Sequence, residues 1–344
     1  MRQSRSRFAY VTAALLAGGL MLTACGSDDD GGDTTSGDGG DNGSETEVEM
    51  VSDVDTGSCE PASEAGEMPD PEGTGDDETD ITIGVFAGWD ENYVVYELLR
   101  TALEEQGYTV TARELPEAGA VFTGVADGDI DVIVDAWFPN THAAYIDQFG
   151  DDLEAISCWF DEGYLTTAVN ADSPAQSLDE LADYKEEYGG RIVGIEPGAG
   201  LTKTTKEQVI PTYGLEDWDY PTSSTPAMLS ELEKAMNSGE NIAVSLWHPH
   251  WAYAAYDIRD LEDPEGALGE AERLYNVGRP GFSEDFPNVA QLLKNLYVTN
   301  DQLLEIEDIL VVQNNREQNA ESVQAWLDEN PDFLEDWRAG TLGG

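Results

Sequence analysis

Short apolar runs alternate with amphipathic helical segments from Asp80 onward, and this alternation is the strongest constraint on the fold. Strands are predicted over residues 81–86, 109–113, 130–136, 192–196 and 242–246. Helices are predicted over residues 92–106, 202–208 and 225–237, and over most of the chain from about residue 289, with a break near 330–331. Such alternation implies parallel sheets that helices cover on both faces, and the length suffices for two domains.

The first residues form an export signal of the bacterial lipoprotein type. Arg2, Arg5 and Arg7 precede an apolar run over residues 8–21, and the sequence Leu-Thr-Ala-Cys ends at Cys25. The run is too short to remain as a membrane span, so we expect residues 1–24 to be a signal peptide that is removed. Acylation of the Cys25 sulfur then anchors an extracytoplasmic protein to the outer face of the cell membrane.

Residues 25–79 are dominated by Gly, Ser, Thr, Asp and Glu, with few apolar side chains. A segment of this composition buries too little apolar surface to offset the entropy of ordering. We therefore predict a flexible, acidic tether over residues 25–79 that keeps the domain near the membrane. The alternative is a solubilising tail without a role in reach.

The chain carries 71 acidic and 16 basic residues, which gives a formal net charge of -55. Such a surface repels phosphate backbones and anionic lipid head groups. The charge therefore argues against nucleic acid as a partner and against membrane binding beyond the lipid anchor. Acidic residues lie in the tether and in the domain alike, which we interpret as an adaptation to salt that does not describe the ligand.

Three cysteines are present, and the lipid anchor accounts for Cys25. The remaining Cys59 and Cys158 form an even pair in a compartment where disulfides persist. We predict a disulfide between them that ties the end of the tether to the folded domain. Two buried or free thiols are the alternative.

Unusual residues follow four of the predicted strands, at residues 87–92, 137–142, 196–202 and 246–251. In open α/β sheets, ligands bind beyond the carboxyl ends of the strands. Three of these segments place a tryptophan at or just past the strand end, namely Trp89, Trp137 and Trp247. Tryptophan faces attract cations, and several rings around one point can surround a quaternary ammonium group.

The remaining segment, which reads Pro-Gly-Ala-Gly-Leu over residues 197–201, points to an anion. Its glycines allow the backbone to come close to a ligand. The first N–H groups of the helix that follows have no partners within that helix, and a carboxylate fits this position. A cationic group among tryptophans, together with a carboxylate, describes a small zwitterion such as a betaine.

These four segments, in this order, resemble the glycine betaine/proline betaine substrate-binding proteins of ABC transporters, the OpuAC/ProX-type family. The similarity extends from about Ile81 to the C-terminus and includes the run Gly-Val-Ala-Asp-Gly-Asp-Ile-Asp over residues 124–131. It implies an α/β fold of the type II periplasmic-binding-protein class, with two lobes, each a central β-sheet flanked by helices, and a ligand cleft between them. Lobe I is expected over residues 80–167 and 274–344, and lobe II over residues 168–273.

The resemblance also implies roles for individual residues. An aromatic cage around the trimethylammonium group would consist of Trp89, Trp137 and Trp247. The carboxylate would accept hydrogen bonds from the backbone of Gly200 and Leu201 and from the side chain of His142. The protein would act as a monomer, catalyse no reaction, need no cofactor, and deliver its ligand to the permease subunit of an ABC importer.

Several alternatives stay open. Trp251 is the rival of Trp247 for the cage. Choline, carnitine or ectoine could replace betaine, and a surface receptor that signals instead of feeding transport would share the fold. A secreted metal-dependent hydrolase would need a metal at His248 and His250, and the lack of a ligand cluster with recognisable spacing argues against it.

We assign the remaining polar and aromatic residues to structural roles and not to the site. We attribute Asp90, Glu91 and Glu196 to the solvated acidic surface. We attribute to core packing the tryptophans outside the four segments, which are Trp159, Trp218, Trp326 and Trp337.

Overall fold

The structure of the protein is a computed structural model that describes residues 48–343. Cys25, the predicted signal peptide and the first part of the predicted tether lie outside the described residues. Among residues 48–343, none of the helices combines the length and the apolar character that crossing a membrane requires.

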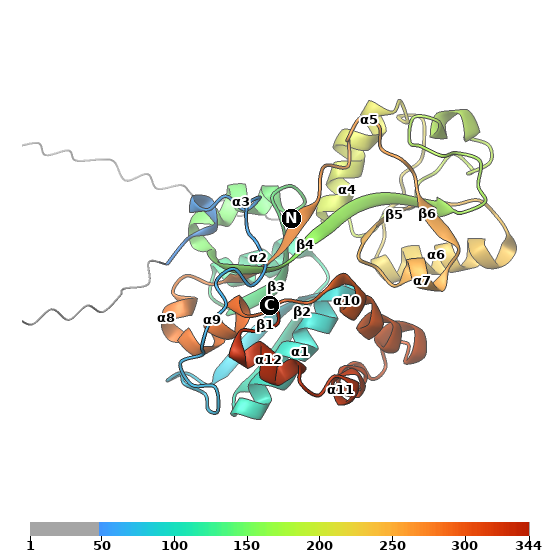
Figure 1. Ribbon diagram of the computed structural model, residues 1–344. Coiled ribbons are helices and arrows are strands. Elements are labelled where there is room, and N and C mark those ends of the chain that lie inside the picture. The colour runs from blue at the N-terminus through green and yellow to red at the C-terminus, as the bar shows by residue number, and fades with distance from the viewer. Residues whose placement is uncertain (1–47, 344) are drawn as a thin grey trace, which may run out of the picture. The chain divides into compact units, whose positions relative to one another are not determined.

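One mixed sheet runs through the described chain in the strand order β2-β1-β3-β7-β4-β5, with β6 paired to β4 (Figure 1). The strands are β1 (Asp80–Phe86), β2 (Thr109–Leu115), β3 (Val132–Phe138), β4 (Glu154–Asn170), β5 (Ala243–His248), β6 (Ile258–Asp260) and β7 (Glu272–Gly278). Strand β1 is parallel to β2 and β3, whereas every pair that involves β4 or β7 is antiparallel. The prediction of purely parallel sheets is therefore wrong, because apolar periodicity does not reveal the direction of pairing.

Strand β4 joins two lobes. Its first part pairs with β7 as far as Gly163 opposite Glu272, and from Tyr164 opposite His248 onward it pairs with β5. Figure 1 shows β4 as a long green arrow that runs from one lobe to the other. The change of partner falls a few residues before the expected lobe boundary at residue 167. The two-lobed α/β architecture expected from the sequence is confirmed.

Helices cover the sheet in both lobes (Figure 1). Those of lobe I are α1 (Asp90–Gln106), α2 (Ala118–Ala126), α3 (Ala143–Phe149), α8 (Phe282–Asp285), α9 (Pro287–Lys294), α10 (Asn300–Glu307), α11 (Asn319–Glu329) and α12 (Phe333–Ala339). Those of lobe II are α4 (Gly200–Thr204), α5 (Ile210–Thr212), α6 (Thr225–Ser238) and α7 (Ala252–Ala255). Short helical turns are η1 (Val51–Asp53), η2 (Gly150–Asp152), η3 (Leu181–Tyr184), η4 (Thr205–Val209) and η5 (Asp308–Gln313).

Local signals account for some of the helix boundaries. Helix α1 ends at Gly107, whose φ of 101° is the left-handed conformation that glycine adopts most easily. Helix α10 begins with a capping box between Thr299 and Gln302. The strand predicted over residues 192–196 does not form as a continuous strand. This segment makes isolated bridges instead, such as Val193 with Val244.

The tryptophans expected in the core are buried. Trp159, Trp326 and Trp337 are among the largest fully buried side chains, and Trp218 is buried as well. The Trp159 indole N–H donates to the Val134 carbonyl at 2.6 Å, which satisfies its polar atom inside the core.

The N-terminal part of the described chain, residues 48–79, packs against lobe I. Val51 is buried, and its N–H donates to the Leu153 carbonyl at 2.8 Å. The buried Asp76 carboxylate accepts a hydrogen bond from the Asn288 N–H at 2.7 Å. Over these residues the prediction of a flexible tether is wrong. Composition does not reveal the packing, because isolated anchors hold the segment and not a periodic apolar pattern.

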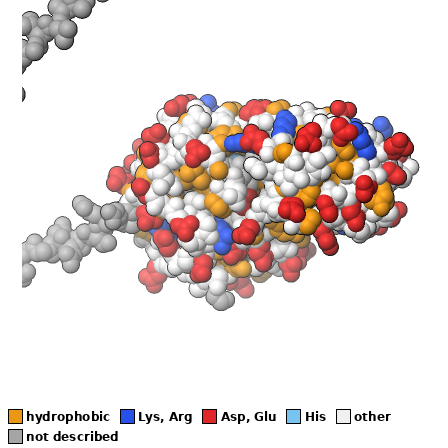
Figure 2. Space-filling model, turned by 90° about the horizontal axis from the view of Figure 1, so that it is seen from above, with side chains coloured by type: hydrophobic (Ala, Val, Ile, Leu, Met, Phe, Trp, Pro, Cys, Tyr) orange, Lys and Arg blue, Asp and Glu red, His pale blue; other side chains and the backbone are white. Residues whose placement is uncertain are grey.

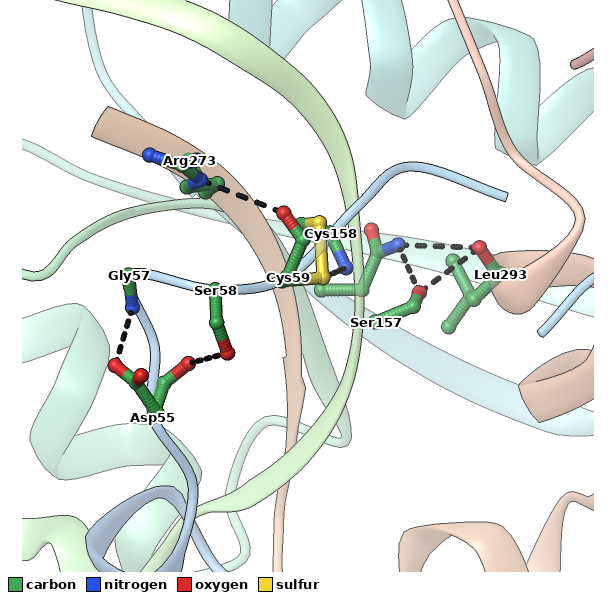
Figure 3. The surroundings of a disulfide bond; sticks show 9 residues. Asp55, Gly57, Ser58, Cys59, Ser157, Cys158, Arg273 and Leu293 are labelled. Carbon is green, nitrogen blue, oxygen red and sulfur yellow. Dashed lines mark hydrogen bonds between the residues drawn. A yellow bond between two sulfur atoms is a disulfide. The ribbon is translucent and has the colours of Figure 1, made fainter. Parts of the chain in front are cut away.

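A disulfide between Cys59 and Cys158 fastens this segment to β4, and it is the pairing that the sequence predicts (Figure 3). The two Cα atoms lie 6.1 Å apart. The Arg273 Nε–H donates to the Cys59 carbonyl at 3.4 Å beside it. The bond closes a loop with a sequence separation of 99, so it removes many conformations from the unfolded chain.

Acidic side chains are spread over the face of the molecule that Figure 2 shows, and basic side chains are few there. Several basic residues are engaged in surface ion pairs, such as Lys185 with Asp217 at 2.7 Å. Exposed pairs of this kind contribute at most about 1 kcal/mol each. The surface therefore carries a large uncompensated negative charge. Dissolved salt screens the repulsion between these charges.

Loss of the disulfide should lower the free energy of unfolding by about 3 to 4 kcal/mol, because the unfolded chain gains conformations. The test is urea unfolding of the double variant Cys59→Ser and Cys158→Ser. Ser58→Ala is the control, since its hydroxyl donates to the Asp55 carbonyl in the same exposed turn. An unchanged unfolding midpoint in the double variant would show that the cross-link contributes nothing.

Candidate ligand-binding site

A small cavity of about 20 Å³ lies between the two lobes. The residues that line it are Trp89, Glu91, Trp137, Thr141, Leu165, Ile195, Ala199, Gly200, Leu201 and Trp247. The structure thus brings together all the predicted ligand-binding residues except His142. A small cavity with mostly apolar walls and a few polar groups is typical of a site for a small ligand.

Trp89 lies between β1 and α1 as the N-cap residue of α1. Its ring stacks on Phe86 and on His142, with ring centroids 4.8 Å and 5.7 Å apart. The interplanar angles of 14° and 13° make the three rings nearly parallel. Because Phe86 and His142 are both buried, they hold the Trp89 ring in one orientation at the cavity wall.

Trp137 lies near the end of β3, and a buried hydrogen bond fixes its ring. The indole Nε1–H donates to the Asp135 carboxylate at 2.8 Å. A Cβ atom at Gly163 would come within 2.9 Å of the Trp137 ring, so the ring packs directly on the backbone of β4. The glycine at which β4 changes partners is therefore also required by the cavity wall.

Trp247 lies near the end of β5 and lines the cavity, whereas its rival Trp251 does not. His250 packs edge-on against Trp247, with ring centroids 4.8 Å apart. The Trp251 Nε1–H donates instead to the buried Asp90 carboxylate of α1 at 2.7 Å. Trp251 therefore links lobe II to lobe I beside the cavity.

The two lobes touch at Thr141 and Gly200. A Cβ atom added to Gly200 would lie 2.0 Å from the Thr141 carbonyl oxygen, so this position requires glycine. Gly200 is the first residue of α4, and the first N–H groups of a helix have no partners within it. The backbone of Gly200 and Leu201 can therefore donate hydrogen bonds to an anion in the cavity.

His142 is buried and is absent from the cavity lining. Its Nδ1 accepts a hydrogen bond from the Trp137 N–H at 2.9 Å, which leaves the proton of the neutral ring on Nε2. This Nε2 has no hydrogen-bond partner in the part of the chain that the structure describes. In this arrangement His142 supports the Trp137 backbone and the Trp89 ring from behind.

Asp90, Glu91 and Glu196 are buried, so their attribution to the solvated surface is wrong. The Glu196 carboxylate accepts a hydrogen bond from the Thr225 N–H at the start of α6, at 2.6 Å. Glu91 lines the cavity, and burial raises its pKa well above the usual value. With 71 acidic residues, the sequence gives no signal that separates a buried carboxylate from an exposed one.

Four further lining residues were not predicted, and they are Thr141, Leu165, Ile195 and Ala199. Two of them, Thr141 and Ala199, lie inside the segments that the sequence singles out. Their position between more distinctive neighbours was the available signal. Leu165 and Ile195 look like any other core residues in the sequence, so no pattern could identify them.

The two histidines considered for a metal site have other partners. His248 Nε2 lies 3.0 Å from the Asp260 carboxylate, and His250 Nδ1 accepts a hydrogen bond from the Ala252 N–H at 3.1 Å. Within residues 48–343, no group of three His, Cys, Asp or Glu side chains is arranged to hold a metal ion.

Two α/β lobes joined by long strands, with a small apolar cavity between them, define a ligand-binding protein of the periplasmic-binding-protein class. A family model for OpuAC, the substrate binding domain of ABC-type glycine betaine transport systems, matches residues 79–329. This match spans well over half of the chain, and the protein belongs to the OpuAC family. Members of this family are binding domains and not enzymes.

Individual relatives agree with the family assignment. The glycine betaine/carnitine transport binding protein GbuC of Listeria monocytogenes serotype 1/2a (strain 10403S) is 35% identical over 164 residues, which are 47% of this chain and 53% of GbuC. The match thus spans about half the length of that relative. Lactococcal OpuAC, in its closed-liganded conformation with glycine betaine, has 25% identity and a TM-score of 0.70, over 76% of this chain and 99% of that chain. An ABC-transporter choline binding protein in complex with choline has 26% identity and a TM-score of 0.69, over 77% and 94%.

Burial lowers the pKa of both His142 and His250 to about 3. An unfolded histidine titrates near about 6.5, so between these values the unfolded chain binds protons that the native state does not. Each ring should therefore reduce the free energy of unfolding by up to about 1.4 kcal/mol per pH unit as the pH falls through this range. In NMR spectra, both rings should keep the nitrogen shifts of neutral imidazole from pH 8 to pH 5. Titration of either ring near its unfolded value would contradict the buried placement.

Proposed function

We propose that this protein is the extracytoplasmic receptor of an ABC importer for glycine betaine or a close analogue. The observation that carries the proposal is the convergence of Trp89, Trp137 and Trp247 on one cavity, which the backbone of Gly200 and Leu201 also lines. Indole faces bind quaternary ammonium groups, and the N–H groups at the start of a helix bind carboxylates. Together the two kinds of group match a ligand that carries both charges.

The expected magnitudes are compatible with such a receptor. Each desolvated indole contributes about 2 kcal/mol, so three rings contribute roughly 5 kcal/mol when their effects are not fully additive. Each hydrogen bond to the carboxylate adds about 1.5 to 3 kcal/mol. The proposed third donor is the Nε2–H of His142, which has no partner among the described residues; because His142 does not line the cavity here, this contact requires its ring to reach the cavity when the ligand binds. After the costs of association and lobe closure, the sum corresponds to a dissociation constant on the order of micromolar.

The relatives support the choice of ligand. GbuC is named for glycine betaine and carnitine, and the lactococcal structure holds glycine betaine in a closed conformation. Here too the lobes are in contact, through Trp251 with Asp90 and through Thr141 with Gly200. Because the proposed ligand is a neutral zwitterion, the acidic surface neither attracts nor repels it strongly.

Replacement of Trp137 by alanine should weaken glycine betaine binding about thirtyfold or more, because one desolvated cation–π contact is lost. Isothermal titration calorimetry measures the change. Trp218→Ala is the matched control, since Trp218 is buried in lobe II and does not line the cavity. An unchanged affinity in a folded Trp137→Ala protein would remove this ring from the cage, and an undetectable affinity in the wild type would refute the proposed ligand.

We also propose that the lipid on Cys25 anchors the receptor to the outer face of the cell membrane. The support is the sequence Leu-Thr-Ala-Cys after a basic start and an apolar run. The variant Cys25→Ala should lose the acylation site, so the mature domain should leave the membrane fraction while the wild type remains there. Equal retention of both proteins in washed membranes would contradict lipid anchoring.

A further inference from the structure

Carboxyl groups without a cationic partner lie at and behind the cavity wall. Glu91 lines the cavity with 1% of its surface exposed, and its Oε2 has no hydrogen-bond partner among residues 48–343. Asp135, on β3, and Glu307, at the end of α10, are fully buried and close enough to act on Glu91 electrostatically. We call Glu91, Asp135 and Glu307 the carboxyl cluster.

The other charged groups around the cluster are paired or neutral. Asp90, next to Glu91 in α1, accepts hydrogen bonds from the Arg316 guanidinium through both carboxylate oxygens. Arg316 thus pairs with Asp90, and its charge also acts on Glu307 without reversing the rise in the pKa of that carboxyl group. His250, on the segment after β5, is buried with its pKa lowered to about 3, so it carries no charge near neutral pH. The Asp135 carboxyl group accepts a hydrogen bond from an uncharged donor, the Trp137 indole N–H.

Ionisation of all three carboxyl groups of the buried cluster would cost more free energy than keeping at least one of them protonated. Burial is the largest cause that raises the pKa of each cluster member, and repulsion from Asp135 and Glu307 raises the pKa of Glu91 further. Protons shared within such a group belong to the cluster as a whole. The ligand-free cluster therefore holds protons at pH values where exposed carboxyl groups are ionised.

Resting on the proposed function, we infer that the protonation state of Glu91 decides which charge class of ligand the cavity binds. A quaternary ammonium cation binds with release of a proton from the carboxyl cluster. A zwitterion binds with the cluster still protonated. A cation among the three indoles brings an unbalanced charge into a buried site. Glu91 in the cavity wall balances it by losing its proton to the solvent. A zwitterion brings its own carboxylate, which the Gly200 and Leu201 backbone receives, so it needs no such balance.

The mechanism gives a different pH dependence of affinity for each of the two ligand classes. Release of one proton makes the affinity for a cation rise about tenfold per pH unit, until the pH passes the pKa of the cluster in the ligand-free protein. The affinity for a zwitterion stays nearly constant over the same range. The cavity therefore favours zwitterions at acidic pH and admits cations as the pH rises.

Calorimetry in pairs of buffers with different ionisation heats tests the inference, because the difference in apparent heat counts the protons released. The probes are choline chloride as the cation and glycine betaine as the zwitterion, titrated into the soluble domain in its oxidised form or the full chain. For choline we expect a release close to one proton and a dissociation constant that falls about tenfold per pH unit between pH 5 and 7. For glycine betaine we expect little proton release and less than about a threefold change in affinity.

Two variants locate the effect. Glu91→Gln keeps the size and polarity of the side chain but has no proton to release, so choline binding should weaken at pH 7 and lose its proton release and its pH dependence. Glycine betaine binding should change far less. Glu97→Gln is the matched control, because Glu97 lies on the same helix with its pKa raised by burial, pairs with Arg100, and does not line the cavity.

The outcomes separate the two proposals. Binding of glycine betaine together with choline binding that releases no proton, or with no choline binding at all, would overturn the role of Glu91 and leave the proposed function intact. Retention of proton release in Glu91→Gln would also overturn it, as would loss of the release in Glu97→Gln. Failure of both probes to bind the wild type would refute the proposed function and the inference with it.

Discussion

Three indole rings from separate strand ends must converge on one cavity, and each ring depends on a different buried support. Trp89 stacks on Phe86 and His142, which also stack on each other, and the Trp137 indole N–H donates to Asp135. Trp247 rests against the edge of His250. Cation–π attraction requires the ring faces to be in place before the ligand arrives, since each reorientation would cost affinity. The supports are therefore as much a part of the site as the rings.

The long strands that join the lobes also shape the cavity. Strand β4 changes its pairing partner at Gly163, where the Trp137 ring lies against the backbone. Strand β7 begins at Glu272, whose carboxylate accepts hydrogen bonds from the Asn140 and Thr141 N–H groups at 2.7 and 2.8 Å. The turn that carries Thr141 to its contact with Gly200 is thus held from the connecting strand. A displacement of one lobe relative to the other would therefore move the residues of the cavity wall.

Much of the cavity lining could be predicted from the sequence, because distinctive residues at strand ends, such as Trp89 and Gly200, mark it. The course of the chain between the lobes could not be predicted. The sequence of a long strand such as β4 does not indicate which strands pair with it or in which direction, since side-chain alternation is the same for parallel and antiparallel pairing. The position of Glu91 was hidden by the abundance of acidic residues. The packing of residues 48–79 was hidden because single anchors such as Val51 hold it.

The central claim is that the cavity recognises a positive charge, and not merely a bulky trimethyl group. The most direct measurement is calorimetric comparison of glycine betaine with 3,3-dimethylbutanoate, in which a carbon atom replaces the quaternary nitrogen at nearly the same shape. The account predicts binding of the carbon analogue weaker by at least about a hundredfold, because the cation–π attraction of three rings is lost. Equal affinities for the two compounds would contradict it.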